Sequence, residues 1–352
     1  MKRNLLAIAI PALLVAGAAN ASIEVWNKDG NKLSVNGRVY ALNYIGDKGN
    51  TNDKDGDHTT ARIGFTGETQ VTDLLSGYGR FEWETNTGKD AKNEARYAFA
   101  GLNFGQYGSF DYGRNDGVLK TIGAYTDVLP EFGGDTGSYY VLTARQNAVA
   151  TYRNTGFFGL VDGLNFALQY ADSGESWTGN QNNEKTWDYK EAYGLNTEYA
   201  ILDTGLTAGA GYATTSKAGP DSKRYNTYTF GLKYDANDLY LAANYFHQKH
   251  DENKVKGFEV VAQYGFDFEV GRLTPSLGYV QHKTDGDNGY LAKYVEVGMQ
   301  YDFNKNLTAI VDYKINLLDS DDAGALVNNG TAYVSHKGNT KDTVALGLIY
   351  QF

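Results

Sequence analysis

Apolar and polar residues alternate with a period of two along nearly the whole chain from Leu33 onward, and this feature restricts the fold most. In the first such segment Leu33, Val35 and Val39 share one face, and Asn36 and Arg38 share the other. Successive side chains of a β-strand point to opposite sides, so the pattern predicts strands with one apolar and one polar face. Helical periodicity is nearly absent. The chain is therefore predicted to be all-β.

The same alternation returns in later segments, at residues 61–71, 164–170, 228–234, 258–264, 307–315 and 344–352. Short connections alternate with long polar ones, the short ones at residues 72–73 and 203–205 and the long ones at 47–59, 173–188 and 318–342. At roughly 20 residues per strand and connection, the chain has room for about 16 antiparallel strands, an even number typical of outer-membrane barrels. No Pro- or Ser-rich linker divides residues 22–352, which are predicted to form one domain.

The first 21 residues have the order of a secretory signal peptide. Lys2 and Arg3 precede an apolar run from Leu5 to Ala19, and small residues precede the expected cleavage after Ala21. A transmembrane helix is the alternative, but the run is too short to span a bilayer and no stop-transfer charges follow. No later window offers eighteen uncharged apolar residues, so no membrane helix is expected.

A soluble β-sandwich or propeller would also alternate, and it is the main competing fold. Tyrosine, with 28 residues, is the commonest large side chain and tends to stand at strand ends, like the aromatic girdle of a membrane barrel. The polar faces carry charges that a dry core could not hold unpaired but a water-filled lumen could. A sheet in lipid must close, because lipid offers its edges no partner. The charged residues on these faces include Arg38, Arg62, Glu68, Arg80, Glu82, Glu84 and Arg96.

Composition excludes several other functions. The absence of Cys excludes a disulfide-stapled module and a thiolate metal site, and the net charge of −10 disfavours a nucleic-acid partner. Acidic stretches at residues 53–57 and 285–288 lack the spacing of calcium loops. They are interpreted as solvated outer loops, with loose binding of divalent ions as the alternative. The five His residues form no metalloprotease pattern, and no cofactor, metal site or catalytic residue is expected.

The segment from Leu119 to Ala144 is long, lacks strand alternation and includes the run PEFGGD at residues 130–135. A long irregular segment in a barrel is either an outer loop or a loop folded into the lumen. Its composition does not decide between the two.

Specific sequence blocks occur at residues 27–32 (NKDGNK), 61–70 (ARIGFTGETQ), 108–115 (GSFDYGRN), 125–135 (YTDVLPEFGGD), 150–154 (ATYRN), 157–166 (FFGLVDGLNF), 231–237 (GLKYDAN), 303–306 (FNKN) and 350–352 (YQF). Together they closely resemble the general diffusion porins of enterobacterial outer membranes, especially the porin F and porin C types. The resemblance implies a homotrimer of 16-stranded antiparallel transmembrane barrels, each with its third outer loop folded inward. It implies passive diffusion of ions and small hydrophilic solutes, and no enzyme activity.

Carried over by position, the resemblance also implies a pore constriction. Alternation independently places Arg38 and Arg62 on polar faces. Guanidiniums stay charged at physiological pH, so a basic wall facing carboxylates creates a transverse field that orients solutes and separates cations from anions. The alternative is scattered lumen charges with no joint role. The implied wall cluster is Arg38, Arg62, Arg96 and Arg145, facing Asp127 and Glu131 on the inward loop, with Glu82 and Lys120 also at the constriction.

Three positions depart from the family pattern. Glu94 stands where related porins often have lysine, Arg80 replaces a neutral residue, and Lys120 lies where an aromatic is common. Ion preference is therefore not inherited with the resemblance. The second outer loop, residues 85–93, is short, which puts the latch between subunits in doubt. Other implied partners are outer-membrane lipid, lipopolysaccharide and the insertion machinery, which reads the terminal Phe352.

Two other functions compete with a general channel. An outer-membrane protease or phospholipase would need a positioned nucleophile and base, and the sequence offers only scattered Ser and His. A solute-specific channel would show an aromatic slide or extra lysines on the inward loop. Lys120 favours anions there, whereas the acidic net charge favours cations at the channel mouths.

Overall fold

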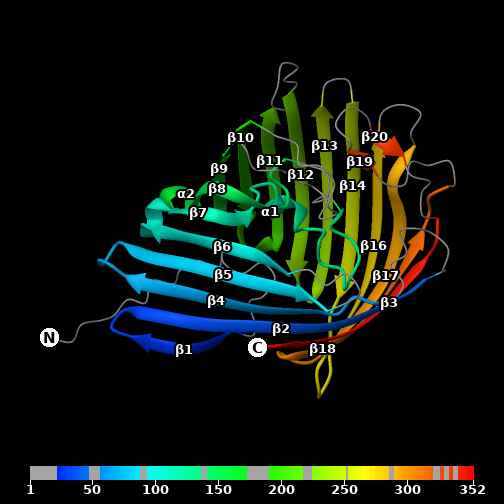
Figure 1. Ribbon diagram of the computed structural model, residues 1–352, viewed down its shortest axis with the longest axis horizontal. Coiled ribbons are helices and arrows are strands. Elements are labelled where there is room, and N and C mark those ends of the chain that lie inside the picture. The colour runs from blue at the N-terminus through cyan, green and yellow to red at the C-terminus, as the bar shows by residue number, and fades with distance from the viewer. Residues whose placement is uncertain are drawn as a thin grey trace.

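The chain forms a closed barrel of 16 long antiparallel strands, as predicted (Figure 1). The structure is a computed structural model that describes residues 22–46, 56–87, 93–135, 141–172, 190–216, 224–250, 253–284, 289–319, 326–328, 333–335 and 340–352. In these ranges no helix has the length and apolar character needed to cross a membrane.

Each wall strand pairs with the next one along the chain. The wall strands are β2 (Asn31–Gly46), β4 (Thr60–Gln70), β5 (Ser76–Asn86), β6 (Asn93–Asn103), β7 (Ser109–Asp116), β8 (Arg145–Asn154), β9 (Leu164–Ala171), β10 (Ala192–Ala200), β11 (Leu206–Ser216), β12 (Arg224–Ala236), β13 (Leu239–His250), β14 (Asn253–Tyr264), β16 (Arg272–Thr284), β17 (Tyr290–Asn304), β18 (Leu307–Asn316) and β21 (Thr343–Gln351). The shorter strands are β1 (Ile23–Lys28), β3 (Gly56–Asp57), β15 (Phe266–Asp267), β19 (Leu326–Asn328) and β20 (Tyr333–Ser335), and the helical turns are η2 (Gly105–Tyr107), α1 (Lys120–Gly123), α2 (Gly156–Gly159) and η4 (Leu202–Thr204).

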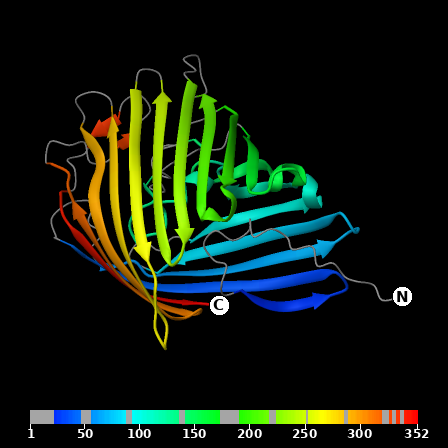
Figure 2. The same ribbon diagram turned by 180° about the vertical axis from the view of Figure 1, so that it is seen from behind.

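The two ends of the chain close the barrel. β21 pairs with β18 on one side and with β2 on the other. Gly37 and Phe352 exchange backbone hydrogen bonds of 2.7 and 2.9 Å, and the Phe352 ring occupies the space where a side chain at Gly37 would lie. Figure 2 shows the closed wall from behind, with green and yellow strands running beside the orange and red ones. No strand edge of the wall is left open along this seam.

The barrel is apolar outside and polar inside, the reverse of a soluble sandwich. Large apolar side chains such as Trp83 and Phe230 are exposed on the outer face. Polar side chains such as Gln169 and Thr229 are buried on the inner face, where Thr229 donates a 3.0 Å hydrogen bond to Asn244. The period-two faces predicted from the sequence therefore have the orientation of a barrel in lipid.

The exact element boundaries differ from the prediction in three places. β1 precedes the first predicted strand and pairs with β2. Inside the predicted loop at residues 47–59, β3 pairs with the end of β2, and inside the predicted loop at 318–342, β19 and β20 form a separate hairpin. These strands are too short to show a periodic pattern. The predicted signal peptide, the loop at residues 173–188 and the acidic stretch at 285–288 lie outside the described residues.

Candidate functional site

The segment between β7 and β8 lies against inward-facing side chains of the barrel. The backbone N–H of Val118 donates to the Gln169 side chain on β9 at 2.7 Å. Further along, the Thr126 hydroxyl donates to Glu259 on β14 at 2.5 Å. The carbonyl of Val128 accepts a 2.8 Å hydrogen bond from the side chain of Gln263 at the end of β14. The segment therefore follows the inner wall from β9 to β14, and it is called the inner segment below.

Inward-facing glycines make room for the apolar side chains of the inner segment. Gly209 on β11 lies directly opposite Gly231 on β12 in the strand register. A Cβ atom added at either position would come within 3.0 Å of Ile122. Such close contacts force side chains or backbone to shift, which destabilises a packed site. Other glycines with this role are Gly194 beneath Val118, Gly211 beneath Leu119, Gly278 beneath Leu129 and Gly298 beneath Pro130.

The far end of the inner segment is anchored where the barrel closes. The Tyr40 hydroxyl donates to the Glu131 carboxylate at 2.6 Å, and the Tyr44 hydroxyl donates to the same carboxylate. The backbone N–H groups of Glu131 and Phe132 donate to the Asp312 carboxylate at 2.9 and 3.2 Å. The inner segment is thus hydrogen-bonded to the wall both near Val118 and at Glu131 and Phe132.

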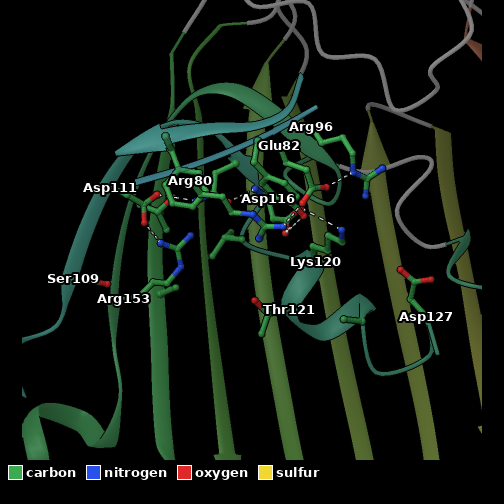
Figure 3. A pocket seen from close by; sticks show the side chains of 18 of the residues that line it. Arg80, Glu82, Arg96, Ser109, Asp111, Asp116, Lys120, Thr121, Asp127 and Arg153 are labelled. Carbon is green, nitrogen blue, oxygen red and sulfur yellow. Dashed lines mark hydrogen bonds and ion pairs between the residues drawn. The ribbon is translucent and has the colours of Figure 1, made fainter. Parts of the chain in front are cut away.

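A cavity of about 870 Å³ lies between the inner segment and the opposite wall. Its lining comes from both sides and is strongly charged, with seven Arg or Lys residues and five Asp or Glu residues. Figure 3 shows Lys120 and Asp127 on the inner segment, and Arg80, Arg96 and Arg153 on strands of the wall. The charged lining residues are Arg38, Arg62, Arg80, Arg96, Lys120, Arg153 and Lys233, and Glu82, Asp111, Asp116, Asp127 and Glu198.

A bulge in β6 brings a further charge to the wall. Glu82 pairs with Tyr97 and Trp83 pairs with Ala95, so Arg96 is an extra residue between the two pairs. Both Arg96 and Tyr97 are shielded from the outside, whereas Ala95 is exposed. Bulges re-aim side chains in this way. The bulge thereby turns two consecutive residues inward.

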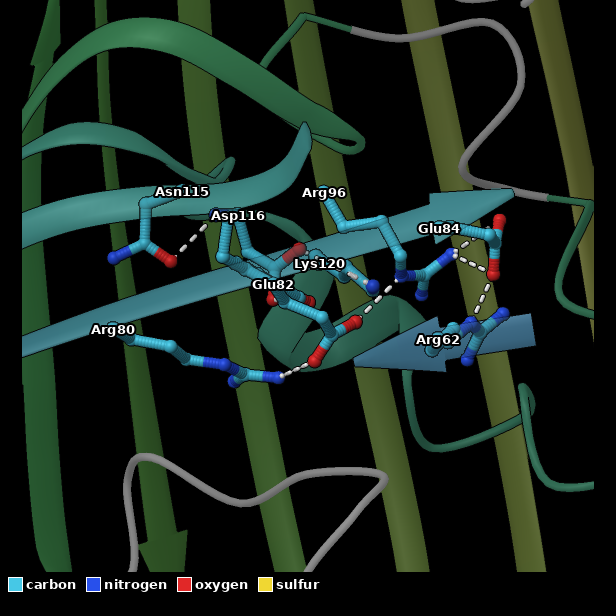
Figure 4. A network of polar contacts seen from close by, with 9 residues as sticks. Arg62, Arg80, Glu82, Glu84, Arg96, Asn115, Asp116 and Lys120 are labelled. Carbon is cyan, nitrogen blue, oxygen red and sulfur yellow. Dashed lines mark hydrogen bonds and ion pairs between the residues drawn. The ribbon is translucent and has the colours of Figure 1, made fainter. Parts of the chain in front are cut away.

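Ion pairs join the charged residues of β4, β5 and β6 (Figure 4). Arg62 Nε pairs with Glu84, and Glu84 also lies 3.1 Å from Arg96 Nη1. Arg96 Nε is 2.7 Å from Glu82, whose other oxygen is 2.6 Å from Arg80 Nη2. The five side chains form an alternating series, which is called the charge ladder below.

The structure brings most of the predicted constriction residues together. Arg145 starts β8 opposite Asp116, and its guanidinium lies 5.7 Å from the centre of the Tyr97 ring. The Glu131 carboxylate is held by the two tyrosines of β2. Lys120 pairs with Asp116 at 3.2 Å. The predicted residues that line the cavity are Arg38, Arg62, Glu82, Arg96, Lys120 and Asp127.

Sequence reasoning missed several functional residues. Glu84 was recognised as a charge on a polar face but not as the partner of two arginines. Arg153 and Asp111 form an ion pair at the cavity, and Lys233 and Glu198 line it from β12 and β10. The short turn between β4 and β5 sets the register that places Arg62 opposite Glu84, so turn length is a signal that could have found this pair. Among the described residues no group of three or more His, Asp or Glu is arranged to hold a metal ion.

Comparisons with known proteins agree with this geometry. The sequence profile of the Gram-negative porin family matches residues 28–352. Outer membrane protein S2 of Salmonella typhi is 46% identical and outer membrane porin C of Enterobacter cloacae is 47% identical, and in each case both chains are covered in full. The solved structure of Salmonella typhi OmpF in complex with daunomycin superposes with a TM-score of 0.77 at 35% identity. It covers 94% of this chain and 100% of the other.

Proposed function

The chain belongs to the Gram-negative porin family and is an outer-membrane β-barrel channel, and from this premise we propose that its lumen is a water-filled path for passive diffusion. The solutes are ions and small hydrophilic molecules. The observation that carries the proposal is the charged cavity of about 870 Å³ between the inner segment and the wall. Hydrated ions can occupy such a passage without the desolvation cost that an apolar one imposes.

The constriction of this path lies where the inner segment faces the arginine-rich wall. Guanidiniums on one side and carboxylates on the other create a fixed transverse field across a wet gap. The field orients dipolar solutes and gives cations and anions different tracks. The basic side consists of Arg38, Arg62, Arg96 and Arg145 with Glu82 among them, and the inner segment contributes Asp127, Glu131 and Lys120.

Processing and assembly follow the family. Residues 1–21 are a cleaved signal peptide, residues 22–352 form one barrel domain, and three barrels assemble in contact with lipid and lipopolysaccharide. Phe352 is the signal for the insertion machinery, and it also completes the seam of the barrel at Gly37. Deleting Phe352 is expected to lower the yield of folded trimer in cells, and a normal yield would contradict this role.

Swelling of proteoliposomes tests the diffusion proposal. The purified protein is reconstituted, and the vesicles are transferred into isotonic solutions of uncharged sugars of increasing size. Swelling rates are expected to fall steadily with sugar size and to show no saturation with concentration, because no binding step is involved. A folded, inserted barrel that admits none of the sugars would contradict the proposal, and a saturable rate for one sugar would indicate a solute-specific channel instead.

A further inference from the structure

The charge ladder neutralises most of the positive charge on the wall that it occupies. Three guanidiniums share two carboxylates, and each carboxylate contacts two of the guanidiniums. Opposite charges in contact cancel each other at distances larger than their separation. An ion in the cavity therefore experiences much less than the full charge of three arginines.

The arginines on either side of the ladder, Arg38 and Arg145, take no part in its contact ion pairs and interact with Glu84 only at longer range. The Nε atoms of Arg38 and Arg145 are buried and make no hydrogen bond within the described part of the chain. Their guanidiniums lie near tyrosine rings instead, Arg38 at 4.7 Å from Tyr40 and Arg145 at 5.7 Å from Tyr97. The wall thus contains two kinds of arginine, and the difference depends on where carboxylates are placed.

Glu84 is the carboxylate whose position controls this difference most directly. It bridges Arg62 and Arg96, both of which line the cavity. Its side chain is 16% exposed, whereas that of Glu82 is 4% exposed and also holds Arg80. Removing the charge of Glu84 alone therefore leaves the more deeply buried part of the ladder intact.

We propose that Glu84 is a selectivity-determining residue, which shifts the channel toward cations by neutralising Arg62 and Arg96 at the constriction. The inference rests on the proposed channel function and adds to it the residue that sets ion preference. In its absence Arg62 loses its ladder partner, Arg96 keeps only Glu82, and the net positive charge of the ladder rises by one. A unit charge a few ångströms from an ion path changes the local ion concentration severalfold, so anions are attracted.

The variant Glu84→Gln isolates this charge. Glutamine has nearly the same shape, and its carbonyl oxygen still accepts a hydrogen bond from a guanidinium, so the arginines keep a partner. The matched control is Glu269→Gln, which removes the same charge from an exposed residue in the turn between β15 and β16. Bulk water screens its charge from the constriction.

Reversal potentials in planar bilayers test the proposal. The gradient is about 0.1 M against about 0.01 M KCl, at which the Debye length is about 10 to 30 Å and lumen charges act on permeating ions. For Glu84→Gln the permeability ratio of K⁺ to Cl⁻ is expected to fall roughly two- to fourfold, and for Glu269→Gln by much less. Conductance at about 1 M KCl is expected to be unchanged in both variants. At this concentration the lumen charges are screened, so conductance depends mainly on the width of the pore.

A second variant separates charge from shape. Glu84→Gln/Arg62→Gln restores the net charge of the ladder, so the permeability ratio is expected to return close to that of the wild type. Equal shifts in the two single variants, or no recovery in the double variant, would overturn the inference while leaving a conducting channel. A change in conductance at about 1 M KCl that matches the shift would assign the effect to pore width and would also overturn it. A wild-type barrel that does not conduct would overturn the proposed function itself.

Discussion

The wall formed by β4, β5 and β6 and the wall formed by β11, β12 and β13 both face the lumen, but their inward side chains differ in kind. The first presents long charged side chains joined in the charge ladder. The second presents glycines such as Gly209 and Gly231, over which Ile122 and Tyr125 of the inner segment pack. We expect the first wall to shape the electric field in the lumen and the second to give room for the inner segment. Changes to the two walls should therefore have separable effects.

The largest expected effect comes from neutralising three arginines of the charged wall. Replacing Arg62, Arg96 and Arg145 together by glutamine leaves Arg80 paired with Glu82 and removes both ladder partners of Glu84. The permeability ratio of K⁺ to Cl⁻ is expected to rise roughly tenfold or more, because three positive charges leave the constriction. The shorter side chains should also raise conductance at high salt. An unchanged reversal potential in a KCl gradient would contradict the role of the arginine wall.

Substitutions in the wall of β11, β12 and β13, called the glycine wall below, should lower the free energy of unfolding. Gly231→Ala places a Cβ atom 2.7 Å from Tyr125 and 2.8 Å from Ile122, so the inner segment must shift. Overpacking of this kind costs about 1–3 kcal/mol in the free energy of unfolding. Urea unfolding in lipid vesicles measures the change. Gly67→Ala is the matched control, because a Cβ atom there meets nothing within 4 Å. Equal losses in the two variants would mean that the glycines do not position the inner segment.

A third test concerns the anchor of the inner segment, the hydrogen bonds that hold Glu131 and Phe132 against the wall. Tyr40→Phe and Tyr44→Phe each remove a hydroxyl that donates to the Glu131 carboxylate. A hydrogen bond to a charged group contributes about 1.5–3 kcal/mol, so the backbone amides of Glu131 and Phe132 should exchange with solvent faster. Hydrogen exchange at these two amides measures the effect.

Tyr313→Phe is the control for the anchor, since its hydroxyl donates to Asp342 at 2.6 Å in an exposed position. It should leave exchange at the anchor unchanged. Faster exchange in this control, or unchanged exchange in both anchor variants, would show that the tyrosines of β2 do not hold the segment.

The smallest effect is expected at Lys120. Its ion pair with Asp116 is partly exposed, with 29% and 33% of the two side chains accessible. Exposed pairs contribute about 0–1 kcal/mol, so Lys120→Gln should leave the free energy of unfolding nearly unchanged. The loss of one positive charge should shift the reversal potential slightly toward cation preference. A shift as large as that of the triple arginine variant would place the main basic charge on the inner segment rather than on the wall.

Alternation was sufficient to predict the strands of the barrel and the inward orientation of Arg38 and Arg62. In a regular strand successive side chains point to opposite faces, so the position of a residue in the pattern fixes its face. Alternation could not predict that Arg96 and Tyr97 both face inward. That arrangement requires the bulge between β5 and β6, which depends on how two strands pair. Alternation placed Arg96 on a polar face, but its place in the basic cluster was predicted only through the resemblance to porins.

The glycine wall illustrates a different limit. Gly209 and Gly231 lie within strands and directly opposite each other, and the alternation of apolar and polar residues assigns them no role. Their purpose depends on Ile122, which is nearly 90 residues earlier in the sequence than Gly209. Contacts of such separation have no local signature. The inner segment itself could be identified as irregular, but the choice between an outer loop and a lumen position needed the structure or the family.

The central claim is that the space between these two walls conducts ions, and planar-bilayer recording of the wild-type protein in an asymmetric KCl gradient tests it most directly. The account predicts large, stable conductance steps that close in thirds, together with a reversal potential displaced from zero by the charged walls. A folded and inserted barrel that stays silent would contradict the account. Steps that close singly would retain the channel and contradict the trimer.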